Sequence, residues 1–190
     1  MAASASEAAD GAPVAEASAA KRDVRKGLIG IGSNVGDRRA NLQAAVDALR
    51  AAGIVVHAAS SLYDTDPVGE VLDQPSFLNG CLLIETSLAP LELLDEAKRI
   101  ERELGRAAEG LRHGPRPIDI DILLLGELEL EHERMILPHR EVLSRRFVLI
   151  PALELDRSLR TPGGVALADA LAELPLTEGV RWAQLPPAIA

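Results

Sequence analysis

The sequence is poor in aromatic residues, in cysteine and in basic residues relative to acidic ones. Its 190 residues include only four aromatic side chains, so the position of each is informative. The single cysteine, Cys81, has no partner for an internal disulfide, which excludes a disulfide-stapled secreted fold and fits a reducing compartment such as the cytoplasm. The net charge of −9 argues against a general nucleic-acid binder and against a protein of anionic membrane surfaces.

Long apolar runs are also missing. The longest ones, such as residues 122–125, are far too short to span a bilayer. Residues 1–20 have neither the basic start and apolar stretch of a secretory signal nor the arginines of a transit peptide. We therefore expect a disordered, Ala-rich tail over residues 1–24, a folded domain over 25–175 and a C-terminal tail over 176–190.

Alternating strand and helix patterns fill the folded segment. Asp37 is a candidate N-cap for a helix that extends to about Ala52, because one apolar face recurs at helical spacing through it (Leu42, Ala45, Val46, Leu49). Pro90 suits the first turn of a second helix that ends near Leu104. Strands are predicted over 28–32, 54–63, 77–86 and 118–125, and short helices near 147–153 and 167–174. This β-α-β-β-α-β order predicts an α+β fold: a ferredoxin-like core with a mostly antiparallel sheet and added C-terminal helices.

Two long segments between these elements, residues 64–76 and 106–117, read as loops. Prolines limit their conformations, and loops of this length in a compact domain are often lids over a site. We expect both to close over the ligands of such a site.

The tripeptide from Asp119 to Asp121 places two carboxylates on one face of a predicted strand. Residues two apart in a strand point the same way, while Ile118, Ile120 and Ile122 face the core. Like charges this close repel, and hard divalent cations such as Mg²⁺ would relieve the repulsion. The alternative is a pair of acids on the solvated face of the strand.

Basic residues are concentrated on both sides of this pair. The segment 98–116 and the segment 132–147 each carry a surplus of positive charge, whereas the rest of the chain is acidic. Arginines around carboxylate-bound metal ions are the arrangement that a polyphosphate needs. No P-loop is present, and the run Gly30-Ile31-Gly32-Ser33-Asn34 reads as a tight strand-to-helix turn in which Ser33 or Asn34 bonds backbone groups.

Two phenylalanines offer a second kind of site. Phe77 opens the third predicted strand, and Phe147 follows the second basic segment. Two phenyl rings can hold a flat heterocycle between them, and the amide of Asn79, on the face of Phe77, suits its lactam or guanidine edge. The alternative is that both rings are core residues.

These residues together resemble one family, the 6-hydroxymethyl-7,8-dihydropterin pyrophosphokinases of folate biosynthesis. The likeness covers roughly residues 27–157, and its most specific stretch is Gly114-Pro115-Arg116-Pro117-Ile118-Asp119-Ile120-Asp121. The other matching segments are 30–34, 73–79, 137–139 and 145–149.

The resemblance implies transfer of pyrophosphate from ATP to the hydroxymethyl group of a reduced pterin, with release of AMP. It implies two Mg²⁺ ions on Asp119 and Asp121, with Arg106 and Arg116 as further catalytic residues. The implied pterin-binding positions are Thr65, Asp66, Val68, Phe77, Asn79 and Phe147. The implied ATP-binding positions are Lys98, Glu101, Arg106, Arg112, Arg116, Ile122, Arg134, Ile136, His139 and Arg145.

The chain departs from the family pattern at three positions. It has His113 where a tryptophan is common, Ala108 where an arginine is common, and Arg140 where a tyrosine is common. Our hypothesis is that Arg112 and Arg140 compensate on the nucleotide side.

Two other readings stay open on the residues alone. One is a Mg²⁺-dependent phosphoryl or nucleotidyl transferase acting on another small alcohol; the other is a non-enzymatic binding module on a ferredoxin-like sheet. The set of Phe77, Asn79 and Phe147 favours a flat heterocycle, and the acidic balance opposes RNA binding. We expect small-molecule partners only, without nucleic acid or membrane, and a monomer, with a dimer as the alternative.

Overall fold

The structure, a computed structural model, describes residues 23–67, 72–106, 114–176 and 179–189. Its strands are β1 (Arg25–Ser33), β2 (Val55–Ala59), β3 (Leu62–Thr65), β4 (Phe77–Thr86), β5 (Asp119–Leu125), β6 (Leu130–His132), β7 (Met135–Leu137) and β8 (Val180–Gln184). Its helices are α1 (Arg38–Ala51), α2 (Pro90–Glu103), α3 (Arg146–Leu155) and α4 (Leu167–Glu173). No described helix has the length and apolar character that a membrane span requires.

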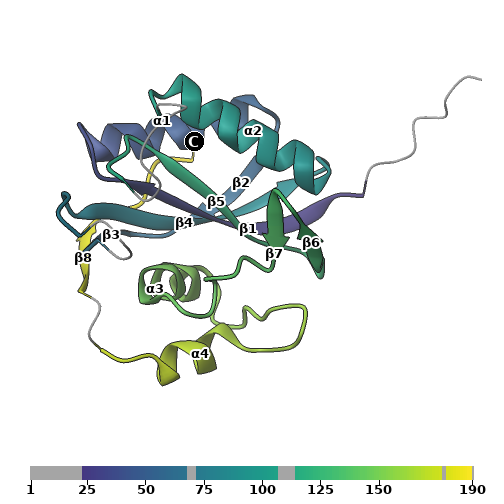
Figure 1. The fold of residues 1–190 in the computed structure, drawn as a ribbon. Helices are drawn as coiled ribbons and strands as arrows, with labels where there is room; N and C mark the ends of the chain where they lie inside the picture. The colour runs from purple at the N-terminus through teal and green to yellow at the C-terminus, as the bar shows by residue number, and fades with distance from the viewer. Residues whose placement is uncertain (1–22, 68–71, 107–113, 177–178, 190) are drawn as a thin grey trace, which may run out of the picture.

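The main sheet is antiparallel and has the strand order β5-β1-β4-β3-β8, with β2 also paired to β4. Figure 1 shows α1 and α2 on one face of this sheet and α3 and α4 on the other. The α+β class and the mostly antiparallel sheet predicted from the sequence are therefore confirmed. The β6–β7 hairpin, which forms a separate two-stranded sheet, was not predicted, because its strands have only three residues each.

The two predicted long helices, α1 and α2, are both present, and each buries its apolar face against the sheet. Asp37 caps α1 by accepting a hydrogen bond from the backbone N–H of Ala40 at 3.0 Å. The predicted apolar face of α1 is fully buried against the sheet (Leu42, Ala45, Val46, Leu49). Pro90 begins α2, whose buried face includes one charged residue, Glu101, beside Leu93, Ala97 and Ile100.

The single strand predicted over 54–63 is wrong, because the chain forms two strands, β2 and β3, separated at Ser60 and Ser61. Both strands pair with β4 in turn. At the break, the Ser60 hydroxyl accepts the Cys81 N–H at 2.9 Å, so a side chain replaces a ladder bond. Gly80 lies opposite, and a Cβ there would meet Leu62 Cδ2 at 2.9 Å. The bend thus depends on a polar residue and a glycine that periodicity does not reveal.

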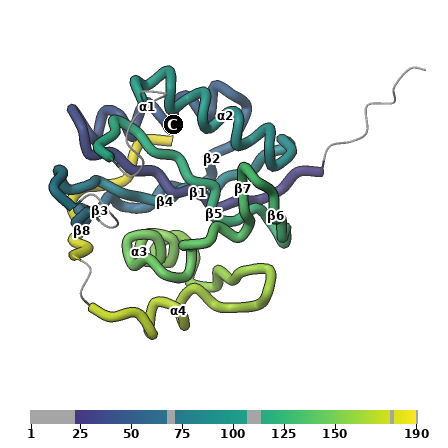
Figure 2. The backbone as a smooth tube through the Cα atoms, viewed as in Figure 1, coloured from purple at the N-terminus to yellow at the C-terminus, as the bar shows by residue number. Residues whose placement is uncertain are grey.

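Residues 180–184 form β8 at the edge of the main sheet. From the sequence alone they were predicted to belong to a C-terminal tail. The run is short and flanked by prolines, so its local pattern is weak, and the open edge of β3 supplies the pairing. Beyond β8 the chain returns to α1 (Figure 2). Arg39 of this helix donates to the carbonyl of Leu185 at 2.7 Å, and Gln43 exchanges two hydrogen bonds with Ala188.

Candidate functional site

Asp119 and Asp121, the acidic pair, lie on β5 as the sequence predicts. Ile118, Ile120 and Ile122 are buried on the opposite side, in the core under α1 and α2. Beside the pair runs β1, in which Gly32 is opposite Asp119 and Gly30 is opposite Asp121. Because glycine has no side chain, this part of the sheet forms an open floor next to two carboxylates.

The two members of the acidic pair differ in their partners. Asp119 forms ion pairs with Arg106 and, at 2.6 Å, with Arg116. Burial disfavours its charge, but these arginines and Lys98 outweigh burial and lower the pKa of Asp119. The carboxylate of Asp121 makes no hydrogen bond or ion pair within the described part of the chain. Burial, followed by the negative charge of Asp119, raises the pKa of Asp121 to about 7.

Glu101 lies behind the acidic pair and is only 2 % exposed. Its Oε1 accepts the backbone N–H of Ile120 at 2.8 Å, receives Lys98 Nζ at 2.7 Å and pairs with Arg106 at 2.9 Å. Ile120 lies between the two aspartates. The Glu101 carboxylate therefore holds the backbone of the acidic pair and also binds two cations beside it, Lys98 and Arg106. Glu101 itself lines neither of the cavities described next.

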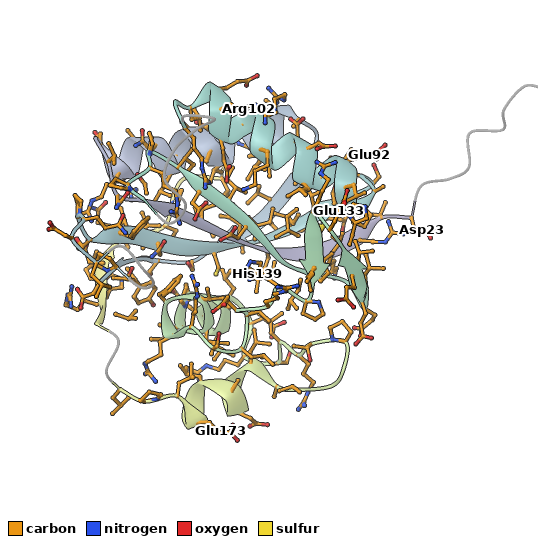
Figure 3. The ribbon with its side chains drawn as sticks, in the orientation of Figure 1. Asp23, Glu92, Arg102, Glu133, His139 and Glu173 are labelled. Carbon is orange, nitrogen blue, oxygen red and sulfur yellow. The ribbon has the colours of Figure 1, made fainter. Side chains whose placement is uncertain are left out.

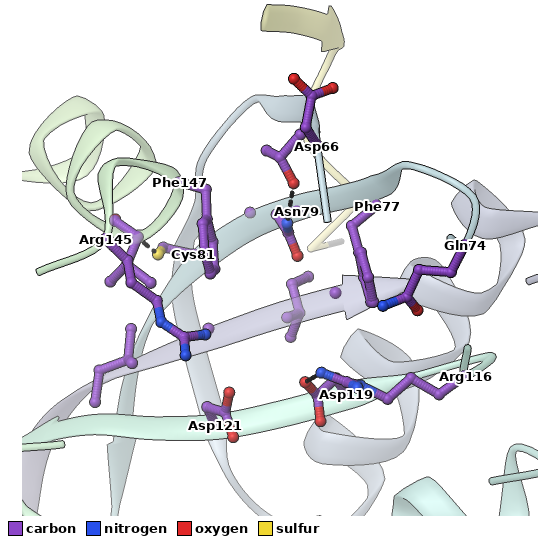
Figure 4. A pocket seen from close by; sticks show the side chains of 17 residues that line it. Asp66, Gln74, Phe77, Asn79, Cys81, Arg116, Asp119, Asp121, Arg145 and Phe147 are labelled. Carbon is purple, nitrogen blue, oxygen red and sulfur yellow. Dashed lines mark hydrogen bonds and ion pairs between the residues drawn. The ribbon is translucent and has the colours of Figure 1, made fainter. Parts of the chain in front are cut away.

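The first cavity, the aromatic slot, lies between Phe77 of β4 and Phe147 of α3 (Figure 4). Between the rings, Asn79 donates from Nδ2 to Thr65 Oγ1 at 2.6 Å. Asn79 fits there because Gly32 has no Cβ; one would meet Asn79 Oδ1 at 2.4 Å. The lining of the slot also includes Asp66 and Gln74.

A guanidinium group covers each phenyl ring. Arg116 lies 5.1 Å from the centroid of Phe77, and Arg145 lies 5.4 Å from that of Phe147. The space left in the slot is about 60 Å³, room for only a few water molecules. A bicyclic ligand therefore requires these side chains to move. The Arg116 Nε is buried and has no hydrogen-bond partner among the described residues, which leaves a donor for a ligand oxygen.

The second, larger cavity measures about 690 Å³ and lies on the other side of the acidic pair. Its lining is rich in cations (Lys98, Arg106, Arg116, Arg134, Arg140, Arg145) and includes Ile122, Ile136 and His139. The Nδ1 of His139 accepts the Glu141 N–H at 3.2 Å, so its Nε2 is free to donate. Burial, and then Arg145, lower the pKa of His139 and favour its neutral form.

His139 lies near the middle of the molecule, whereas Glu92, Arg102 and Glu173 are exposed on its periphery (Figure 3).

The slot and the large cavity meet at four shared residues: Arg116, Asp119, Asp121 and Arg145. Two ligands bound in these cavities would therefore face each other across the acidic pair and two arginines.

The structure thus brings most of the candidate residues together. Five of the six pterin positions line the slot (Thr65, Asp66, Phe77, Asn79, Phe147). Eight of the ten ATP positions line the large cavity, Glu101 lies behind it, and Val68 and Arg112 fall outside the described residues. The departures at 108 and 113 also fall outside them, while Arg140 lines the large cavity.

Asn34 has a structural role that extends beyond the local turn predicted from the sequence. It is 2 % exposed, and its Nδ2 donates to Gln74 Oε1 and to the carbonyl of Pro75. Its Oδ1 accepts the Arg116 N–H at 2.7 Å. Asn34 therefore joins the ends of both loops, 64–76 and 106–117, to the end of β1. These partners are 40 or more residues away, so no local pattern indicates them.

We predict a pH dependence of stability from the raised pKa of Asp121. A carboxyl whose pKa rises from 3.8 to about 7 on folding binds its proton more tightly in the folded state. This contribution is complete below about pH 4 and is lost as the pH rises through about 7. Urea unfolding in EDTA should therefore show a declining free energy over this range, and Asp121→Asn should flatten the decline.

The matched control is Asp169→Asn, which removes an exposed carboxylate of α4 and should leave the decline intact. The same decline in Asp121→Asn as in the wild type would contradict the assignment.

The chain is similar to several known proteins. A family model described as 7,8-dihydro-6-hydroxymethylpterin-pyrophosphokinase (HPPK) matches residues 28–157. A Pseudomonas aeruginosa protein named 2-amino-4-hydroxy-6-hydroxymethyldihydropteridine pyrophosphokinase is 43% identical over 159 residues, which cover 83% of this chain and 96% of that protein. The Bacillus subtilis protein of the same name is 44% identical over 158 residues, 82% of this chain and 89% of its own length.

Longer proteins contain a similar region. The chain matches 26% of an Arabidopsis thaliana folate synthesis bifunctional protein, at 45% identity over 128 residues, 67% of this chain. Among solved structures, a Plasmodium falciparum HPPK-DHPS with pteroate has a TM-score of 0.63 at 12% identity, over 81% of this chain and 41% of that one, which supports the fold. Because the family model matches more than half of the sequence, the chain belongs to the 7,8-dihydro-6-hydroxymethylpterin-pyrophosphokinase (HPPK) family.

Proposed function

We propose that this protein transfers the pyrophosphoryl group of ATP to the hydroxymethyl group of 6-hydroxymethyl-7,8-dihydropterin, giving AMP and the pterin diphosphate in folate biosynthesis. The observation that carries the proposal is the junction of two cavities at the acidic pair. One cavity has flat aromatic walls and an amide, and the other is large and cationic. The names of the P. aeruginosa and B. subtilis relatives support the same reaction.

In this proposal the pterin occupies the aromatic slot. Phe77 and Phe147 contact its two faces, and the Asn79 amide bonds its edge. Thr65 and Asp66 line the same slot, and Val68, outside the described residues, completes the proposed set of pterin contacts. Arg116 and Arg145, each over one of these rings, lie where the slot joins the large cavity and can turn from the rings toward the phosphates.

ATP occupies the large cavity. Lys98, Arg106, Arg116 and Arg145 neutralise the phosphates, and the Nε2–H of His139 donates to one of their oxygens. Three residues that line the large cavity contact the nucleoside side (Ile122, Arg134, Ile136), and Arg140 adds a cation there. Arg112, outside the described residues, completes the proposed set of ATP contacts. Glu101 acts from behind, by holding Lys98 and Arg106.

The acidic pair fits Mg²⁺. Asp121 is a partly buried carboxylate without a direct partner in the described structure, next to a second carboxylate, and Mg²⁺ characteristically takes one or two carboxylates plus phosphate oxygens and water. No cluster of three or more histidine, cysteine, aspartate or glutamate ligands occurs in the described ranges, so substrate oxygens would complete the coordination. We propose that Asp119 and Asp121 hold two Mg²⁺ ions, which would withdraw charge from the phosphates.

The protein's own contribution is position and charge. The slot and the large cavity direct the substrate hydroxyl toward the phosphates of ATP, and this placement lowers the barrier of an in-line displacement. Arg106 and Arg116 lie at the transfer point and stabilise the charge that develops there. The substrate alcohol is the nucleophile, so no activated serine or cysteine is required.

We also propose the finer features of fold and location. The order β5-β1-β4 with β2 and β3 beside β4 supports a ferredoxin-like core, extended by β8 and by α3 and α4. The buried, unpaired thiol of Cys81 supports a cytoplasmic location.

The direct test is AMP formation from ATP and Mg²⁺ with and without 6-hydroxymethyl-7,8-dihydropterin. We expect pterin-dependent AMP from the wild type and a loss of about a hundredfold or more in Asp119→Ala, because a charged group at the transfer point is removed. Asp169→Ala is the surface control. Pterin-dependent ADP would indicate a simple kinase, and AMP formation without pterin dependence would overturn the proposal.

Gly32→Ala should weaken pterin recognition. Its Cβ would meet Asn79 Oδ1 at 2.4 Å, so the amide must move away from the edge of the slot. We expect kcat/KM for the pterin to fall by about ten- to a hundredfold, as displaced recognition groups commonly cause, with little change in KM for ATP. Gly163→Ala, at an open loop position with its nearest contact at 3.8 Å, is the matched control. Equal kinetics in both variants would refute the steric argument.

Glu101→Gln should slow turnover without contacting substrate. Glutamine keeps an acceptor for the Ile120 N–H but loses the charge that holds Lys98 and Arg106. We expect activity to fall by about ten- to a hundredfold, the usual cost of losing such a supporting group. Glu103→Gln, on the exposed surface of the same helix, should retain wild-type kinetics. Unchanged activity in Glu101→Gln would show that the two cations hold their places without it.

A further inference from the structure

Strand β8 lies beyond the segment 28–157 that the family model matches, yet it adjoins the aromatic slot. It pairs antiparallel with β3, and its first residue, Val180, is opposite Thr65 at the end of β3. Thr65 and the next residue, Asp66, both line the slot. Strand β8 therefore supports the backbone of Thr65 and Asp66, which form one wall of the slot.

Asp66 is tied to this strand by two contacts. Its backbone N–H donates to the carbonyl of Gly179 at 3.2 Å, and its Oδ1 accepts from Arg181 at 2.9 Å. Figure 4 shows the Asp66 carboxylate turned away from the acidic pair. The side chain is thus directed outward, while the main chain of Asp66 stays at the slot.

Gly179 makes room for this contact. A Cβ at that position would lie 2.1 Å from Asp66 Oδ2 and 2.6 Å from Arg181 NH1. A glycine is therefore required for the carboxylate and the guanidinium to meet above the strand. The arrangement continues into the slot, because Thr65 Oγ1 accepts the hydrogen bond of the Asn79 amide.

We propose that Arg181 is a positioning residue for the pterin pocket: by holding the Asp66 carboxylate against β8, it sets the main chain of Thr65 and Asp66 at the wall of the slot. The inference rests on the proposed function, because it takes the slot to be the pterin site. It assigns a specificity role to the C-terminal strand, outside the matched family segment.

This role is separable from folding. The Arg181–Asp66 pair is 58% exposed on both sides, and exposed pairs contribute little to stability. The C-terminal segment is also fastened independently, by the bonds of Arg39 to Leu185 and Pro186 and by the two bonds between Gln43 and Ala188. Loss of the Arg181 side chain should therefore leave β8 and the backbone bond from Asp66 to Gly179 in place and release only the Asp66 carboxylate.

The experiment is a kinetic comparison of Arg181→Ala with the wild type, together with calorimetric binding of the pterin in the presence of a non-hydrolysable ATP analogue and Mg²⁺. We expect KM and Kd for the pterin to rise by about two- to fivefold, the range that an exposed ion pair supports. The kcat, the KM for ATP and the melting temperature should stay unchanged. Arg157→Ala, an exposed arginine without a described contact, should match the wild type in every readout.

A double-mutant cycle tests whether Arg181 acts through Asp66. In an Asp66→Asn background, Arg181→Ala should add no further increase in pterin KM. Additive effects would overturn the proposed route, and an unchanged pterin KM in Arg181→Ala would overturn the positioning role. A parallel rise in the KM values of both substrates with a lower melting temperature would assign β8 to stability alone. Failure of the wild type to bind the pterin at all would overturn the proposed function itself.

Discussion

The repulsion between the two carboxylates of β5 is the constraint on which the rest of the site depends. Strand geometry points Asp119 and Asp121 the same way, in a partly buried place where solvent screens them poorly. Arg106 and Arg116 compensate the first carboxylate, and the second remains without a direct partner in the described structure. Glu101, buried beneath them, holds the strand and two cations in register. One carboxylate without a direct partner thus lies beside several cations, which is the charge arrangement that the proposed reaction with Mg²⁺ and ATP uses.

The two faces of the sheet explain how a small domain can hold two carboxylates that repel each other. One face is sealed by α1 and α2, and their core includes Ile118 and Ile120, which lock β5 from below. The opposite face is covered by α3 only as far as Phe147 and Val148. Beyond them the floor of the slot is made of Gly30 and Gly32, next to the acidic pair at which the two cavities meet. The face under α1 and α2 thus supplies much of the core, whereas the acidic pair and the slot lie on the face that α3 covers only in part.

Sequence patterns predicted the parts of this protein that local physics decides. The apolar face of α1, the Asp37 cap, the Pro90 start of α2 and the alternation around Asp119 are properties of neighbouring residues, and all are present. The break at Ser60 and Ser61, strand β8 and the junction at Asn34 depend on contacts between distant segments. The placement of Glu101 behind β5 has the same origin, since a motif shows that a residue belongs to a site but not on which side of a strand it lies.

The glycines of β1 also carry a cost for the stability of the protein. In a strand interior a glycine is about 0.5–1 kcal/mol less favourable than alanine, and β1 is paired on both sides along the stretch that contains Gly30 and Gly32. The methyl group of an alanine at position 30 would make an ordinary contact with Leu123. Selection for thermal stability alone would therefore favour alanine at position 30. The added methyl group would narrow the floor of the slot. Gly30 therefore costs the protein some stability but keeps the floor of the slot open, so a stabilised variant is best designed with β1 left unchanged.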